Sequence, residues 1–158
     1  MSYVATLVDR VFILRWIAPV VEDVDRLNGE LERAAAAARR RLIFVAVVDG
    51  ATLPPSNETR ARLNVGFKQA NESCEFFHFV VTSRGFVHSA HRAIMLASIL
   101  VSGRRGHNFV SSSLREAVTK TPVHTRAELA AGLATAEQRG IVSAGSVAPP
   151  ADHHRSPG

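Results

Sequence analysis

Histidines and carboxylates are the side chains of this chain that could carry acid–base or metal chemistry. The candidates are His78, His88, His91 and His107, with Glu75 and Asp49 as carboxylate partners. His88 and His91 are three residues apart and can share one face of a helix, but a zinc site needs a further ligand and the His-Glu-x-x-His pattern is missing. We therefore expect a surface pair on a helix, and no catalytic residue, metal or cofactor.

Two reactive side chains, those of His78 and Cys74, lie in or beside apolar runs of the sequence. A histidine in such a strand belongs to the sheet more often than to an active site. Cys74 is expected in the core, because buried thiols outnumber catalytic ones. As the only cysteine, it can form no internal disulfide, which suits a reducing cytoplasm.

Sequence patterns of common enzyme sites are missing. The chain has no phosphate-binding loop of the G-x-x-x-x-G-K-[ST] type, no dinucleotide-binding turn and no esterase nucleophile elbow. Ser113 and Glu116 have the spacing of a capping box, which explains the serines there without a nucleophile. A non-enzymatic protein is expected.

Positive charge is concentrated in one part of the chain. The formal net charge is +5, and residues 83–122 hold six Lys/Arg against one acidic residue, so this segment supplies the whole excess. The residues expected to bind an anionic partner or ligand are Arg84, His88, His91, Arg92, Arg104 and Arg105. Ser83-Arg84-Gly85 precedes a predicted helix, whose first N–H groups and dipole favour phosphate or carboxylate. The alternative is a basic surface that serves only solubility.

Hydrophobic patterns and turn residues predict the elements that position these groups. We expect strands at 3–8, 11–17, 42–48, 75–82 and 107–111, and helices at about 20–38, 58–73, 86–101, 113–120 and 125–139. A second capping box, Thr125 with Glu128, would begin the last helix. Arg39–Arg41 is interpreted as a solvated helix end rather than a nucleic-acid patch, so nucleic acid is an unlikely partner.

Two of these helices have informative apolar patterns. The helix at 58–73 would bury Leu63, Phe67, Ala70 and Cys74. The helix at 86–101 is apolar on nearly every face from 93 to 101, so one side can pack on the sheet while the other needs a second cover. That cover is either the C-terminal helix or another subunit.

The order of elements predicts an α/β fold with a mixed, mostly parallel sheet that starts with a hairpin and is flanked by helices. We expect one domain at 1–122, an appended helix at 123–142 and a disordered tail at 143–158. Neither a signal peptide nor a transmembrane segment is expected, because charges interrupt the N-terminal run and no apolar stretch is long enough.

On this element order, the Leu42–Val48 strand and the helix-turn-strand of 90–110, residues 3–120 resemble the STAS-like domains, typified by bacterial anti-sigma-factor antagonists and related to lipid-binding SEC14-like domains. Phosphorylatable members carry Asp-x-Ser-Gly after the third strand, at the start of a helix that faces a kinase. Here the stretch is Asp49-Gly50-Ala51-Thr52, with Ala51 in place of the serine. Thr52 or Ser56 would have to replace it as phosphoacceptor.

Two functions follow as hypotheses. The first is a regulatory or scaffold module in signalling that binds a protein partner and self-associates as a homo-oligomer. The alternative is a binder of a small anionic ligand or lipid headgroup, with a basic rim over an apolar pocket.

Overall fold

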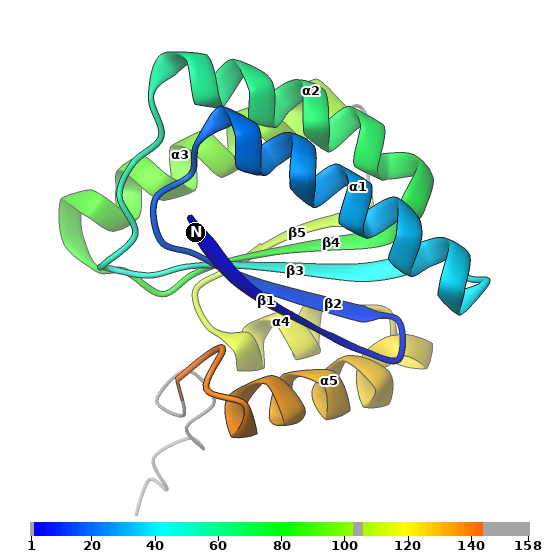
Figure 1. Ribbon diagram of the computed structural model, residues 1–158. Helices are drawn as coiled ribbons and strands as arrows, with labels where there is room; N and C mark the ends of the chain where they lie inside the picture. Colours follow the sequence, from blue (N-terminus) through cyan, green and yellow to red (C-terminus); the bar gives the residue numbers. More distant parts are fainter. Residues whose placement is uncertain (1, 103–105, 144–158) are drawn as a thin grey trace, which may run out of the picture.

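The computed structural model describes residues 2–102 and 106–143, and within them a five-stranded sheet lies between two layers of helices (Figure 1). The strands are β1 (Tyr3–Val8), β2 (Val11–Trp16), β3 (Leu42–Val48), β4 (Cys74–Val81) and β5 (Asn108–Ser111). The helices are α1 (Val21–Ala38), α2 (Asn57–Ser73), α3 (Gly85–Ser102), α4 (Leu114–Lys120) and α5 (Arg126–Gln138), with a 3-10 turn at Val123–Thr125.

The sheet has the predicted mixed, mostly parallel topology. Its strands lie in the order β1-β2-β3-β4-β5, with β1 antiparallel to β2 and the other neighbours parallel. The hairpin turns at Asp9, whose φ of 52° is a left-handed conformation that Asp tolerates better than most residues. Every side chain of β3 is buried, as its unbroken apolar run predicts for a central strand.

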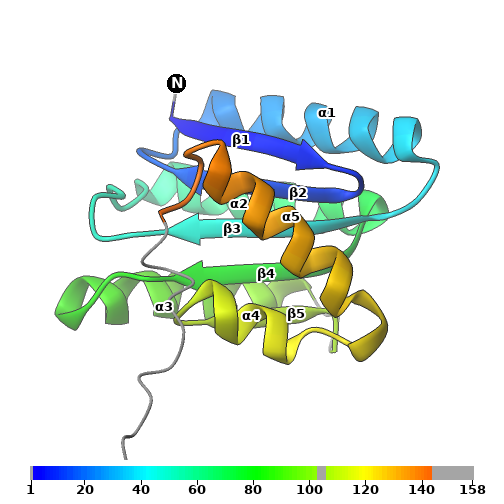
Figure 2. The ribbon, with the colours of Figure 1, turned by 90° about the horizontal axis from the view of Figure 1, so that it is seen from below.

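Each face of the sheet packs against its own helices. Figure 2 shows α4 and α5 in front of the sheet and α1, α2 and α3 behind it. The core toward α1–α3 is aromatic: the rings of Phe12 and Phe44 lie 6.0 Å apart and those of Phe44 and Phe77 5.7 Å apart. The opposite core joins aliphatic side chains of β2 and β3 to α4 and α5 through Leu114, Leu129 and Leu133.

The helix α5 packs closely on β2 at Gly132. A Cβ atom at this position would lie 2.8 Å from Val11 Cβ, closer than side-chain atoms normally approach. The missing side chain therefore lets the helix lie directly on the strand. Leu133 and Ala136 of the same helix are fully packed in this core.

Two sequence expectations about element ends are wrong. Cys74 does not end the buried stripe of α2 but begins β4, although it is buried as expected. Thr125 does not cap α5: its hydroxyl donates to the carbonyl of Pro122, and Glu128 pairs with Arg10 instead. Thr125 therefore bonds within the turn that precedes α5, and Glu128 pairs with a residue distant in sequence.

The first capping box forms with a small change. The Ser113 hydroxyl accepts from the N–H of Glu116, and the Glu116 carboxylate accepts from the N–H of Ser112 rather than of Ser113. The ammonium of Lys120, 2.7 Å away, and the Ser112 hydrogen bond hold the pKa of Glu116 below its usual value. The one carboxylate of the basic segment is therefore neutralised locally.

The expected second cover of α3 is not the C-terminal helix. α5 lies on the opposite face of the sheet, against β1 and β2 (Figure 2). Leu96 of α3 remains exposed. Within the described residues, no helix is long and apolar enough to cross a membrane. Of the expected tail at 143–158, Ser143 is exposed and residues 144–158 lie outside the described residues.

Candidate binding site at the carboxyl edge of the sheet

The carboxyl ends of β2, β3, β4 and β5 lie at one edge of the sheet, which we call the carboxyl edge. The chain leaves β4 into α3 on one face and leaves β5 into α4 on the other (Figure 1). Where the connections after two neighbouring parallel strands run to opposite faces of the sheet, a crevice forms between them outside the carboxyl ends of the strands. This switch point is where open α/β sheets usually bind ligands.

A polar crevice lies at this switch point. It is open to solvent, has a volume of about 660 Å³, and is lined by Thr82, Ser83, Arg84, Gly85, His88, Ser112, Ser113 and Ser143. Every side chain in this lining carries a hydroxyl, a guanidinium or an imidazole, and none is a carboxylate. Arg84 is exposed, and no ion pair to it occurs among the described residues.

Of the anion-binding residues predicted from the sequence, the structure brings Arg84 and His88 together in the crevice. Arg92 lies one turn further along α3, half-buried, where its charge helps to lower the pKa of Glu116. Arg104 and Arg105 lie outside the described residues.

The expected surface pair of His88 and His91 is wrong, because His91 is buried. It is only 3% exposed, and burial lowers the pKa of its imidazole below the usual value. Its Nδ1 atom lies 3.5 Å from the hydroxyl of Ser83. His91 turns inward because its position on α3 faces the sheet, so it is not available to a partner on the surface.

An apolar cavity lies between the sheet and α1–α3, with His91 in its wall. Other parts of the wall are Trp16, Leu53, Pro55 and Phe79. Its volume is about 70 Å³, whereas an engineered apolar cavity that admits benzene measures about 150 Å³. An acyl chain therefore does not fit in this cavity in the present arrangement of the helices.

The two hydroxyls named as phosphoacceptors have different environments. Thr52 is buried, and its hydroxyl donates to the carbonyl of Trp16 while Asp49 accepts from the N–H groups of Ala51 and Thr52. A phosphate on Thr52 would break this turn. Ser56 is exposed at the start of α2, where its hydroxyl accepts from the N–H of Thr59.

An apolar rim at the carboxyl edge is absent from the sequence prediction. It consists of Ile17, Val20, Leu53 and Phe86, which follow β2, β3 and β4 and are exposed. The N–H of Leu53 donates to the carbonyl of Ile17 at 2.9 Å, so the loops after β2 and β3 lie side by side. Periodicity cannot reveal these residues, because each belongs to a loop or to the first positions of a helix.

Comparison with protein-family models, curated proteins and solved structures gives no match for this chain.

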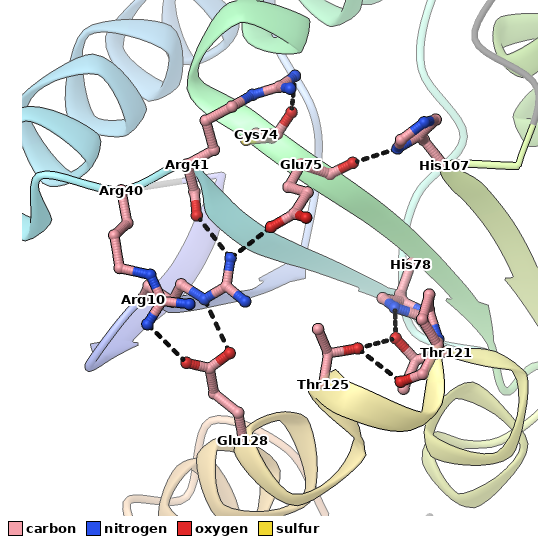
Figure 3. Close-up of polar contacts among 11 residues, drawn as sticks. Arg10, Arg40, Arg41, Cys74, Glu75, His78, His107, Thr121, Thr125 and Glu128 are labelled. Atoms are coloured by element: carbon pink, nitrogen blue, oxygen red, sulfur yellow. Dashed lines mark hydrogen bonds and ion pairs between the residues drawn. The ribbon is translucent and has the colours of Figure 1, made fainter.

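A second polar cluster lies at the opposite edge of the sheet, where β3, β4 and β5 begin (Figure 3). Arg10 donates to Glu75 at 2.6 Å and to Glu128 at 2.8 Å, and Arg40 approaches Glu128 at 3.6 Å. The guanidinium of Arg41 donates to the carbonyl of Cys74 at 2.7 Å. These groups satisfy one another, which is the pattern of a structural clamp, and Arg40 and Arg41 are not simply solvated.

His78 belongs to a buried chain of hydrogen bonds in the same region (Figure 3). The Thr125 hydroxyl donates its hydrogen to the carbonyl of Pro122, so in its contact with Thr121 it must be the acceptor. The Thr121 hydroxyl donates to Thr125 and therefore accepts from His78 Nε2, at 3.2 Å. This order fixes the proton of His78 on Nε2. Burial lowers the pKa of His78 to about 4, so the ring is neutral at pH 7.

No cluster of three or more His, Cys, Asp or Glu side chains that could hold a metal occurs in residues 2–102 and 106–143. The buried His78 and His91 have hydroxyl neighbours, and the lining of the polar crevice combines hydrogen-bond donors with the imidazole of His88 and contains no carboxylate.

Proposed function

We propose that this chain is a non-enzymatic regulatory or scaffold module that binds a protein partner through the carboxyl edge of its sheet. The observation that carries the proposal is the apolar rim, where Phe86 is 88% exposed and Leu53 61%. Large apolar side chains gathered on one exposed face typically mark an interaction surface. An exposed aromatic side chain is also a typical anchor of protein interfaces.

The charge of the region defines the chemistry of the partner. Arg84 precedes α3 and Arg92 lies in its first half, and both belong to the segment that supplies the net positive charge. The partner is expected to present apolar side chains next to carboxylates, because complementary charge accelerates association and excludes wrong partners.

The STAS-like assignment is part of this proposal. The element order supports it, and in that family the loop after the third strand faces a protein partner. The corresponding loop here carries Leu53 of the apolar rim and the exposed Ser56. A cytoplasmic location is consistent with Cys74, the single cysteine, which forms no disulfide bond.

A pair of matched variants tests the proposal. The tagged chain, Phe86→Ser and Val123→Ser are used to capture partners from lysate of the native cell, and each captured protein is quantified by mass spectrometry. Val123 is 75% exposed, but it follows α4 away from the carboxyl edge. We expect Phe86→Ser to lose the partner by about tenfold or more and Val123→Ser to retain it. Equal recovery with all three chains would contradict the proposal.

Self-association through α3 is a separate part of the proposal. Leu96 lies on this helix and is exposed, and α5 covers the other face of the sheet. In analytical ultracentrifugation we expect an oligomer that Leu96→Asp dissociates without loss of the fold, because a charge in an apolar interface is left unpaired. A monomer at tens of micromolar would contradict it.

A further inference from the structure

We propose that the polar crevice binds the phosphate group of a small anionic ligand. This site lies beside the apolar rim and shares Arg84 with the charged surface expected to meet the protein partner, but its ligand is tested without that partner. Arg84, His88 and the serines of three chain segments converge on it: the β4–α3 connection, the β5–α4 connection and the segment after α5. These segments are far apart in sequence, and the fold brings them together at the switch point.

The number of donors favours phosphate over carboxylate. A guanidinium offers five N–H donors and each hydroxyl one, whereas a carboxylate has only two oxygens to accept them. A phosphate monoester has three terminal oxygens and a tetrahedral shape, so donors on several sides can reach it. Arg84 would supply the paired N–H groups, and Ser112 and Ser113 line the crevice from the β5–α4 connection.

His88 adds an observation that is independent of Arg84. Its Nδ1 atom is inaccessible to solvent and has no hydrogen-bond partner among the described residues, although the side chain lines the crevice. An unsatisfied buried polar atom is costly, and it commonly marks the place of a missing partner. Because this atom is closed to solvent, the half-buried ring has to turn toward the crevice before a ligand oxygen or hydroxyl can pair with it.

The surroundings of the crevice favour negative charge. The nearest carboxylate of the basic segment, Glu116, is engaged by Lys120 and by the Ser112 N–H. The crevice also lies at the N-terminal end of the 18-residue helix α3, whose dipole adds positive potential there. The volume of about 660 Å³ is within the range of small-ligand sites.

The phosphate could belong to a soluble molecule or to a lipid headgroup, and the experiment separates these sources. The full chain is titrated calorimetrically with inorganic phosphate and with glycerol 3-phosphate at constant ionic strength. In parallel, it is sedimented with phosphatidylcholine vesicles with or without phosphatidic acid. Each arm is repeated with Arg84→Gln, and with Arg33→Gln as a control that removes an exposed arginine of α1. Circular dichroism confirms that both variants fold.

Saturable binding of a soluble phosphate, weakened at least about tenfold by Arg84→Gln and unchanged by Arg33→Gln, would support the site with a soluble ligand. Binding only to vesicles with phosphatidic acid, lost in the same variant, would support it with a lipid headgroup. No binding in any arm, or equal binding by Arg84→Gln, would overturn the proposal. None of these outcomes depends on partner capture at Phe86.

Discussion

Arg10 Nη1 lies 2.6 Å from Glu75 Oε2, so the turn of the first hairpin is joined to the beginning of β4 by a partly buried ion pair. Arg10 also donates to Glu128 of α5 and to the carbonyl of Arg41. The hydrogen bond from Arg10 is the main reason why the pKa of Glu75 is lower than usual. One guanidinium therefore connects the hairpin, the central strands and the second helical layer.

Removal of this guanidinium should be strongly destabilising. We expect Arg10→Ala to lower the free energy of unfolding by about 3 kcal/mol or more, because two carboxylates lose their partner in a partly buried place. Arg40→Ala removes a pair to the same Glu128, but the Arg40 side chain is 61% exposed. That control should cost less than about 1 kcal/mol. Urea unfolding measures the free energy of unfolding of both variants. Equal losses of stability would contradict a stabilising role of Arg10.

The pKa of His78 predicts a dependence of stability on pH. Burial lowers it from 6.5 to about 4, so between these values the unfolded chain binds a proton that the folded chain does not. The contribution of the neutral ring to stability is complete above pH 6.5 and is lost as the pH falls toward 4. The loss amounts to about 3 kcal/mol.

The variant His78→Leu isolates this contribution. Other groups, among them the buried His91, titrate in both proteins, so the difference between the two stability curves reports His78. We expect the curve of His78→Leu to fall less steeply between pH 6.5 and 4 in urea unfolding. Parallel curves would show that His78 titrates normally.

Substitution of two helical glycines by alanine should have opposite effects. In α1, an alanine Cβ at position 29 would meet only the end of the Arg33 side chain, at 3.4 Å. Gly29→Ala should therefore stabilise by about 0.5 to 1 kcal/mol through helix propensity. Gly132→Ala should destabilise by about 1 to 3 kcal/mol, because its Cβ meets the branched Val11 side chain. Thermal unfolding distinguishes the signs, and stabilisation by both changes would contradict the close packing of α5 on β2.

Charge should influence partner binding at the carboxyl edge through long-range steering. We expect Arg92→Glu to slow association with the captured partner, and the difference from the unmodified chain to shrink at high salt, since screening at physiological ionic strength acts over about 8 Å. Arg33→Glu on α1 makes the same change of charge elsewhere. Surface plasmon resonance gives the association rates, and equal slowing by both variants would indicate a general effect of net charge.

The fold was predictable from local patterns because each element carries its own signal. The apolar run of β3 and the Ser113–Glu116 spacing both predict what the structure contains. The sequence predictions were wrong where a residue distant in sequence competed for the same side chain. Glu128 was expected to cap its own helix, yet the buried Arg10, 118 positions earlier, offers it a stronger partner.

The candidate site was predictable only in part, for the same reason. Arg84 and His88 lie next to a turn and a helix start, which the sequence displays. The contribution of Ser143 depends on the path of the chain after α5, where Arg15 donates to the carbonyl of Ile141 and holds this segment under the sheet. The inward turn of His91 likewise depends on how α3 is rotated against β4.

Hydrogen exchange with and without the captured partner is the strongest test of the claim that the partner binds at the carboxyl edge. We expect slower exchange in the complex at residues 49–56 and 83–88, which include Leu53 and Phe86. Exchange should be unchanged at 106–108 and 121–125, at the opposite edge. Protection confined to the opposite edge, or to the outer faces of α4 and α5, would contradict the claim.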